Sequence, residues 1–212
     1  MFDGTLIIKY FISSLVILLF AWLYVKVYVW LGKNFLIPVI SYGIFYFDRR
    51  YVHKNMEFNV NKKYSAIILA SNYWPEKISV YSIDIPKLLK TLKLKKESYK
   101  VYEFVSAKEF KKIINNPKVS NVYILGHGQR HGVKLGKNEC IYYCEFKNAK
   151  KKEAIFQFHC NHYGGKSLAD YILSKKGISF VTTKKMNTLQ INKIIYENYK
   201  KAKKDSRILL LK

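Results

Sequence analysis

Residues 121–128 have the sequence NVYILGHG, an apolar run that stops at a glycine and a histidine. A short run of this kind, closed by Gly126, is typical of a buried strand that ends in a loop. A second run, AIFQF at residues 154–158, is followed by HCN at residues 159–161. The two segments predict two core strands that each end at chemically reactive side chains.

The sequence around these segments alternates between strand-like and helix-like patterns. Further strands are expected at residues 64–70, 99–105 and 177–182, and helices at residues 84–94, 106–115, 167–173 and 188–203. A hairpin is expected within residues 132–146, with its turn at 136–138. This alternation predicts an α/β fold with a mostly parallel sheet flanked by helices.

The N-terminal 47 residues are apolar enough to anchor the chain in a membrane. Residues 10–25 contain no charged side chain, and apolar residues resume after Lys26. About 20 such residues cross the hydrocarbon layer as a helix, so one transmembrane helix near Phe11 to Trp30 fits. A turn at residues 32–34 would instead give a helical hairpin with a short second arm. A cleaved signal peptide fits less well, because no small-residue cleavage site follows the apolar run.

The chain is expected to divide into a membrane anchor at residues 1–47, a basic juxtamembrane linker at 48–63 and one α/β domain at 64–212. The linker opens with Arg49, Arg50 and Lys54, whereas the N-terminus offers few charges. The positive-inside rule therefore predicts a protein of the cell membrane whose domain faces the cytoplasm.

The net charge of the chain is +24, and +22 of it lies outside the anchor. Such a field attracts anionic lipid headgroups, nucleic acid or acidic proteins. The lysines are spread through all the expected helices and loops, which favours a solvated surface compatible with a membrane over a nucleic-acid site. Three cysteines, an odd number, argue against a disulfide framework and fit a reducing compartment.

His127 and Cys160 follow two of the expected core strands. The loops at the carboxyl ends of parallel strands share one crevice, so the two side chains are expected to meet there. An imidazole beside a thiol favours the thiolate and can later protonate the leaving group. Gly128 would let a substrate carbonyl approach, and its N–H together with that of Cys160 would stabilise an oxyanion. The predicted chemistry is acyl transfer to Cys160.

The segments ILGHG (124–128), FHCNHYGGKSLADYIL (158–173) and ISFVTT (178–183) resemble the caspase-like cysteine peptidases, particularly the CHAT group related to separase and caspases. The resemblance extends over roughly residues 64–203, and only its two strand-end motifs are specific. It implies His127 and Cys160 as a catalytic dyad, with Gly128 at the oxyanion hole. His159 departs from the pattern, which usually has a small residue before the cysteine. The anchor is not part of the resemblance; together the two predict a membrane-anchored cysteine endopeptidase, without a cofactor, that cleaves protein substrates near the bilayer.

Other functions stay open. Taken singly, His127 is a structural histidine in a turn and Cys160 an inert buried thiol, and the fold would then be an inactive interaction module. His127, His131, Cys140 and Cys144 would supply four zinc ligands, although the last two would lie ~13 Å apart on a regular strand. An anionic-lipid or nucleic-acid binding membrane protein would show a steep salt dependence. The expected partners are membrane lipids and a protein substrate or partner, and nucleic acid is not favoured.

Overall fold

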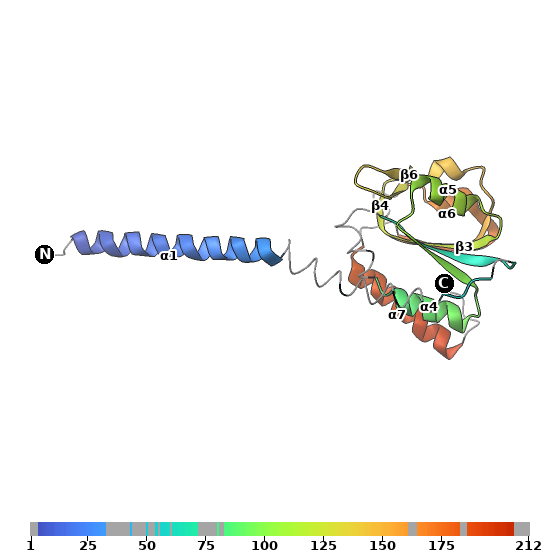
Figure 1. The fold of residues 1–212 in the computed structure, drawn as a ribbon, viewed down its shortest axis with the longest axis horizontal. Coiled ribbons are helices and arrows are strands. Elements are labelled where there is room, and N and C mark those ends of the chain that lie inside the picture. Colours follow the sequence, from blue (N-terminus) through green and yellow to red (C-terminus); the bar gives the residue numbers. More distant parts are fainter. Residues whose placement is uncertain are drawn as a thin grey trace. The chain divides into compact units, whose positions relative to one another are not determined.

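The computed structural model describes residues 4–32, 43, 50, 54, 56–59, 61–71, 80, 83–160, 165–182 and 186–205. The chain divides into two compact units, Met1–Gly43 and Ile44–Lys212. The first contains the long helix α1 (Gly4–Leu31), and the second, called the α/β unit below, contains all the described strands (Figure 1).

Helix α1 is apolar on every side. Its segment Ile12–Leu31 has a mean hydropathy of 2.0 over 20 residues, and none of it is buried. It is long and apolar enough to span a membrane, since a helix of this length covers the hydrocarbon thickness. The second arm of the alternative hairpin, expected at residues 35–47, lies outside the described residues except for Gly43.

The α/β unit is built on a five-stranded sheet whose neighbouring strands are all parallel. The strand order is β2-β1-β3-β7-β8. The strands are β1 (Tyr64–Leu69), β2 (Tyr99–Glu103), β3 (Val119–Leu125), β7 (Lys152–Phe158) and β8 (Leu173–Val181). The predicted α/β class with a mostly parallel sheet is confirmed.

In the described part of the unit, four α-helices flank the sheet: α4 (Ile85–Leu94), α5 (Ala107–Asn115), α6 (Leu168–Ile172) and α7 (Thr188–Lys204). Each begins after a polar residue whose side chain accepts a hydrogen bond from the backbone N–H three residues later; these residues are Asp84, Ser106, Ser167 and Asn187. Pro86 stands in the first turn of α4, where its missing N–H leaves no helical hydrogen bond unmade. Local sequence therefore sets where these helices start.

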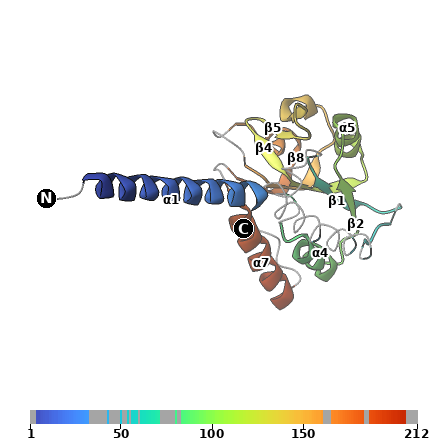
Figure 2. The same ribbon diagram turned by 60° about the vertical axis from the view of Figure 1, so that its left-hand side comes forward.

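The sheet has a buried apolar layer on each face. Tyr123 and Phe156 belong to the layer that includes α4 and α7, whereas Ile124 and Ile155 belong to the layer with α5 and α6. Neighbouring residues take opposite faces because side chains alternate along a strand. Both views show α4 and α7 on one side of the sheet and α5 on the other (Figure 2).

After β3 the chain forms a second sheet of three short antiparallel strands, β4 (His127–Gln129), β5 (Gly132–Lys134) and β6 (Cys140–Tyr142). Strands β5 and β6 confirm the expected hairpin, but its second arm ends earlier than predicted. The 3-10 helix η2 (Tyr143–Phe146) follows, because the three-residue spacing of Tyr143 and Phe146 buries both rings on one side of that turn. Cys144 therefore lies on η2 and not on a strand with Cys140.

Part of the expected linker contacts the α/β unit. The Tyr99 N–H donates to the Glu57 carbonyl at 2.6 Å, and the Asn59 N–H donates to Ser98 Oγ at 3.0 Å. Phe58 packs edge-on against Tyr64, with 4.8 Å between ring centroids. Residues 56–59 thus pack beside the start of β2.

Candidate functional site

His127 and Cys160 leave neighbouring strands at the same end of the sheet. β3 pairs with β7 in parallel, with Leu125 opposite Phe158. Both of these residues belong to the layer on the α4–α7 face. His127 and Cys160 each lie two residues beyond this last pair, His127 at the start of β4 and Cys160 after the end of β7. The structure therefore brings the two predicted strand ends side by side.

Gly128 lies directly against the backbone of Cys160. A Cβ atom at position 128 would be 1.8 Å from the Cys160 carbonyl oxygen and 2.2 Å from His159 Nδ1. Glycine is therefore required by close approach, since any side chain would overlap the neighbouring peptide. This contact joins the two motifs that the sequence singled out, through Gly128 and Cys160.

The thiol of Cys160 is bonded to the backbone of Met186, just before α7. Sγ donates to the Met186 carbonyl at 3.3 Å and accepts from the Met186 N–H at 3.3 Å. Cys160 is 9% exposed, whereas His127 is exposed. Among the hydrogen bonds of the described residues, none joins His127 to Cys160. The thiol and the imidazole come from adjacent strand ends without being paired.

His159 is buried at the centre of a hydrogen-bond network that fixes its tautomer. Its Nδ1 lies 3.1 Å from the Cys160 carbonyl, which only accepts, so Nδ1 carries the proton. Nε2 then accepts from the Tyr143 hydroxyl at 2.7 Å and from the Gln157 amide at 3.2 Å. The Gln157 amide is oriented because its Oε1 accepts from the Leu168 N–H at 2.9 Å. Both nitrogens of His159 are thus occupied in the neutral form.

Burial lowers the pKa of His159 from 6.5 to about 4. The hydrogen bond to the Cys160 carbonyl opposes this lowering, and the nearby His127 adds to it. His159 is therefore neutral near pH 7 and has no free nitrogen with which to act as a base. Its ring instead holds the Cys160 peptide in place, with Thr182 Oγ1 donating to the His159 carbonyl at 2.8 Å.

The four possible zinc ligands are not assembled. His131 Nδ1 accepts from the Lys166 N–H at 2.9 Å, so that nitrogen is occupied. Cys140 begins β6, and Cys144 is exposed on η2. Within the ranges that the structure describes, no three His, Cys, Asp or Glu side chains gather where they would hold a metal ion. The zinc hypothesis therefore has no ligand set in this part of the chain.

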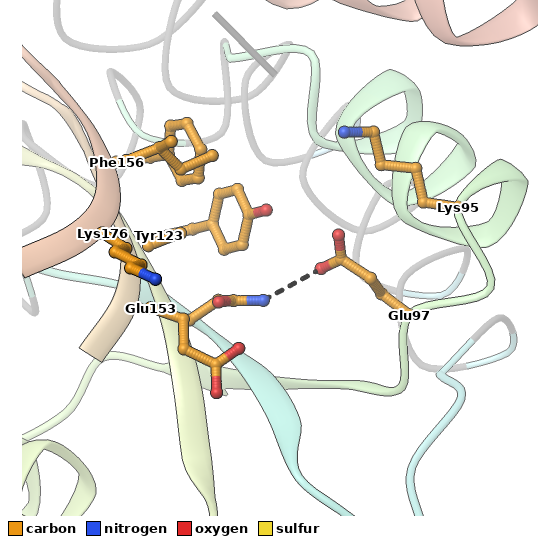
Figure 3. A pocket seen from close by; sticks show the side chains of 9 residues that line it. Lys95, Glu97, Tyr123, Glu153, Phe156 and Lys176 are labelled. Atoms are coloured by element: carbon orange, nitrogen blue, oxygen red, sulfur yellow. Dashed lines mark hydrogen bonds between the residues drawn. The ribbon is translucent and has the colours of Figure 1, made fainter. Parts of the chain in front are cut away.

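A pocket of about 320 Å³ lies toward the amino-terminal end of the strands, away from Cys160. Its lining includes Tyr123, Phe156 and Glu97, whose carboxylate faces the same space as the Tyr123 hydroxyl (Figure 3). Glu97 accepts from Ser65 Oγ at 2.8 Å and from Asn121 Nδ2 at 3.3 Å. Burial, with Glu97 adding to it, raises the pKa of Tyr123 well above 10. These groups are held by one another and lie apart from the strand-end motifs.

The sequence pointed to His127, Gly128 and Cys160, but not to the groups around them. Met186 lies 26 residues from the thiol that it binds. Tyr143 stood in an expected strand, where nothing marked its hydroxyl as a partner for His159. Comparison of the sequence with models of known protein families finds no match, and comparison with curated protein sequences finds none either.

Proposed function

We propose that the α/β unit is a caspase-like cysteine endopeptidase, with Cys160 as nucleophile and His127 as general base. The observation that supports this is the meeting of two strand ends. Leu125 pairs with Phe158 at the ends of β3 and β7, and Gly128 packs on the Cys160 peptide. The imidazole and the thiol each follow the carboxyl end of one of two neighbouring parallel strands, which is the usual functional edge of such a sheet.

In the proposed reaction the Cys160 thiol gives its proton to the His127 imidazole. Sγ then forms a bond to the carbonyl carbon of a substrate peptide, and the oxyanion is stabilised by the N–H groups of Gly128 and Cys160. When the C–N bond breaks, the imidazolium protonates the leaving amine. Water hydrolyses the thioester, releases the acid and restores the thiol.

The contacts of Cys160 define what activation requires. A thiolate cannot donate, so deprotonation abolishes the Sγ–H bond to the Met186 carbonyl. The Met186 N–H donates to Sγ at 3.3 Å in the resting arrangement. In the proposed reaction, Cys160 Sγ would rotate about χ1, away from the Met186 carbonyl and toward His127.

The apolar helix α1 would hold this peptidase at the cell membrane, where it would act on protein substrates close to the bilayer. The basic run after the anchor favours a domain on the cytoplasmic side. The three cysteines are free in the structure, in accord with a reducing compartment.

The test is alkylation of the full-length chain by iodoacetamide, followed by peptide mass analysis of each cysteine. Exposure alone predicts that exposed Cys144 reacts faster than buried Cys160. An imidazole-activated nucleophile predicts the reverse order near pH 7. His127→Ala should slow Cys160 at least tenfold, whereas the matched control His131→Ala should leave its rate unchanged.

One observation favours a second function, a catalytically inactive interaction module. Cys160 is buried and bonded to Met186 in both directions, which is also how an inert structural thiol is held. If Cys160 reacts more slowly than Cys144 and its rate is indifferent to His127→Ala, the peptidase proposal is wrong and the interaction module replaces it.

A further inference from the structure

The two helical layers that flank the sheet differ in charge. Helices α4 and α7 together carry eight lysines and one glutamate, a net charge of +7. Helices α5, η2 and α6 together carry three lysines and three acidic residues, a net charge of zero. One face of the unit therefore presents a strongly basic helical layer, and the opposite layer is balanced.

One row of exposed side chains on α7 lies opposite its buried row, and the exposed residues Gln190, Glu197, Lys201 and Lys204 flank it. The residues of this exposed row, which we call the α7 outer stripe, are Leu189, Lys193, Tyr196, Lys200 and Lys203. Their spacing of three or four residues places them on one side of the helix. The buried residues at the same spacing are Ile191, Ile195, Asn198 and Ala202. The stripe therefore points away from the core, and Leu189 is 78% exposed.

Helix α7 carries five lysines and one carboxylate, Glu197, within its described length. In α4, Lys87 pairs with Asp84, and Lys93 lies 3.3 Å from Glu57. Among the ion pairs of the described residues, none includes a lysine of α7. Instead, Lys200 Nζ lies 4.4 Å from the centroid of the Tyr196 ring. The stripe thus combines lysines that form no ion pair among the described residues with an aromatic ring and an exposed leucine.

We propose that the α7 outer stripe docks the α/β unit on an anionic lipid surface. Lysines beside headgroups are attracted by anionic lipids, a tyrosine ring prefers the headgroup level, and an exposed leucine gains by entering the acyl boundary. Helix α1, if inserted, would confine the unit near the bilayer and raise the effective concentration of the surface. The proposal does not depend on peptidase activity.

The composition of the stripe favours lipid over nucleic acid. Both are polyanions, so the lysines alone do not distinguish them. The apolar side chain of Leu189 forms no hydrogen bond or ion pair with a phosphodiester backbone. At the end of the stripe it can instead insert at the lipid interface. Tyr196 is flanked by Lys200 and by Lys87, whose Nζ lies 5.2 Å from its ring centroid, rather than by further aromatic rings for base stacking.

The test is lysine footprinting of the full chain in nanodiscs. The chain is reconstituted in phosphatidylcholine alone or with 30% phosphatidylserine, pulsed with an acetylating reagent at pH 7.5, and cleaved at glutamate. Cleavage at Glu197 separates Lys193 from Lys200, and cleavage at Glu109 separates Lys108 from Lys112. The last two lysines are exposed on α5 and serve as internal controls.

Lipid docking predicts that Lys193 and Lys200 react at least threefold more slowly in anionic than in neutral nanodiscs, with Lys108 and Lys112 unchanged. The protection should disappear in 0.5 M NaCl because the lipid charge is screened. Lys193→Glu combined with Lys200→Glu should remove the protection of Lys203 and Lys204, whereas Lys108→Glu combined with Lys112→Glu should not.

Equal reactivity of α7 in both lipids, or equal protection of α5 and α7, would overturn the proposal. A third arm adds single-stranded RNA to neutral nanodiscs. Protection of the stripe by RNA but not by anionic lipid would assign the face to nucleic acid instead. The footprint of the wild-type protein alone distinguishes lipid docking, RNA binding and the absence of docking.

Discussion

Among the described residues of the α/β unit, two basic side chains are buried, His159 beside Cys160 and Lys152 at the start of β7. Each is held by specific acceptors or donors. Lys152 Nζ donates to the Asn116 carbonyl at 3.0 Å and to the Val119 carbonyl at 2.8 Å, and burial lowers its pKa to about 8. At the scale of the residue, these two groups make stability sensitive to pH and to substitution.

His159 should make the unit less stable in mild acid. Above pH 6.5 the imidazole is neutral in both states; between pH 6.5 and about 4 only the unfolded chain takes up the proton. The free energy of unfolding should fall by about 3 kcal/mol across this window, at 1.36 kcal/mol per pKa unit. Urea unfolding of the wild type and of His159→Gln at pH values from 7.5 to 4.5 measures this loss, which only the wild type should show. Parallel pH curves for the two proteins would contradict the assignment.

Lys152→Ala should lower the free energy of unfolding by about 2–4 kcal/mol. It empties a buried site and leaves the carbonyls of Asn116 and Val119 without their donor. Lys150→Ala, at an exposed position two residues away, should change it by less than about 0.5 kcal/mol. Chemical denaturation of the two variants checks the difference, and similar losses would show that Lys152 has no special role.

At the scale of the element, most strands and helices were predictable because their signals are local. Apolar runs marked β1, β3 and β7, and caps such as Ser106 marked helix starts. Strand β4 was missed because GHG is typical of a loop and becomes a strand only by pairing with β5. Strand β8 starts at Leu173, earlier than predicted, because Leu173 pairs with Lys152 directly after α6.

The same distinction applies to the candidate site. His127 and Cys160 could be proposed from the sequence because each comes within two residues of the end of an apolar strand, and neighbouring parallel strands end at the same edge of a sheet. The bond from Cys160 to Met186 and the tautomer of His159 could not be predicted from the sequence. They depend on Tyr143, Gln157 and the start of α7, which are brought together only by tertiary packing. Chain spacing contains no signal for such contacts.

The contact between β4 and the end of β7 should tolerate no side chain at position 128. Gly128→Ala should lower the free energy of unfolding by roughly 1–3 kcal/mol, because the new methyl group overlaps backbone atoms that cannot move freely. It should also alter the alkylation rate of Cys160. Gly32→Ala, where the added methyl group meets open space, is the matched control and should leave both quantities unchanged. Thermal unfolding and cysteine alkylation check both effects.

At the scale of the whole molecule, α1 is expected to decide whether the protein stays with membranes. Phe20→Arg combined with Leu23→Arg should release it into the supernatant of an alkaline carbonate wash, since each arginine at a helix centre costs about 2.5–3.5 kcal/mol of insertion. Leu189→Arg on α7 should leave the protein in the pellet, because such a wash removes only peripheral contacts. A pellet that retains the double variant would contradict a spanning role for α1.

Among the described strands, β2 and β8 form the two outer edges of the parallel sheet. Edge strands expose unpaired backbone groups that recruit strands of other molecules, and proteins oppose this with lysines. β2 carries Lys100, and β8 carries Lys175 and Lys176. If α1 inserts, many copies share one two-dimensional surface, where collisions between edges are frequent. These lysines would then protect a crowded membrane population against aggregation, and their charge would matter more there than in dilute solution.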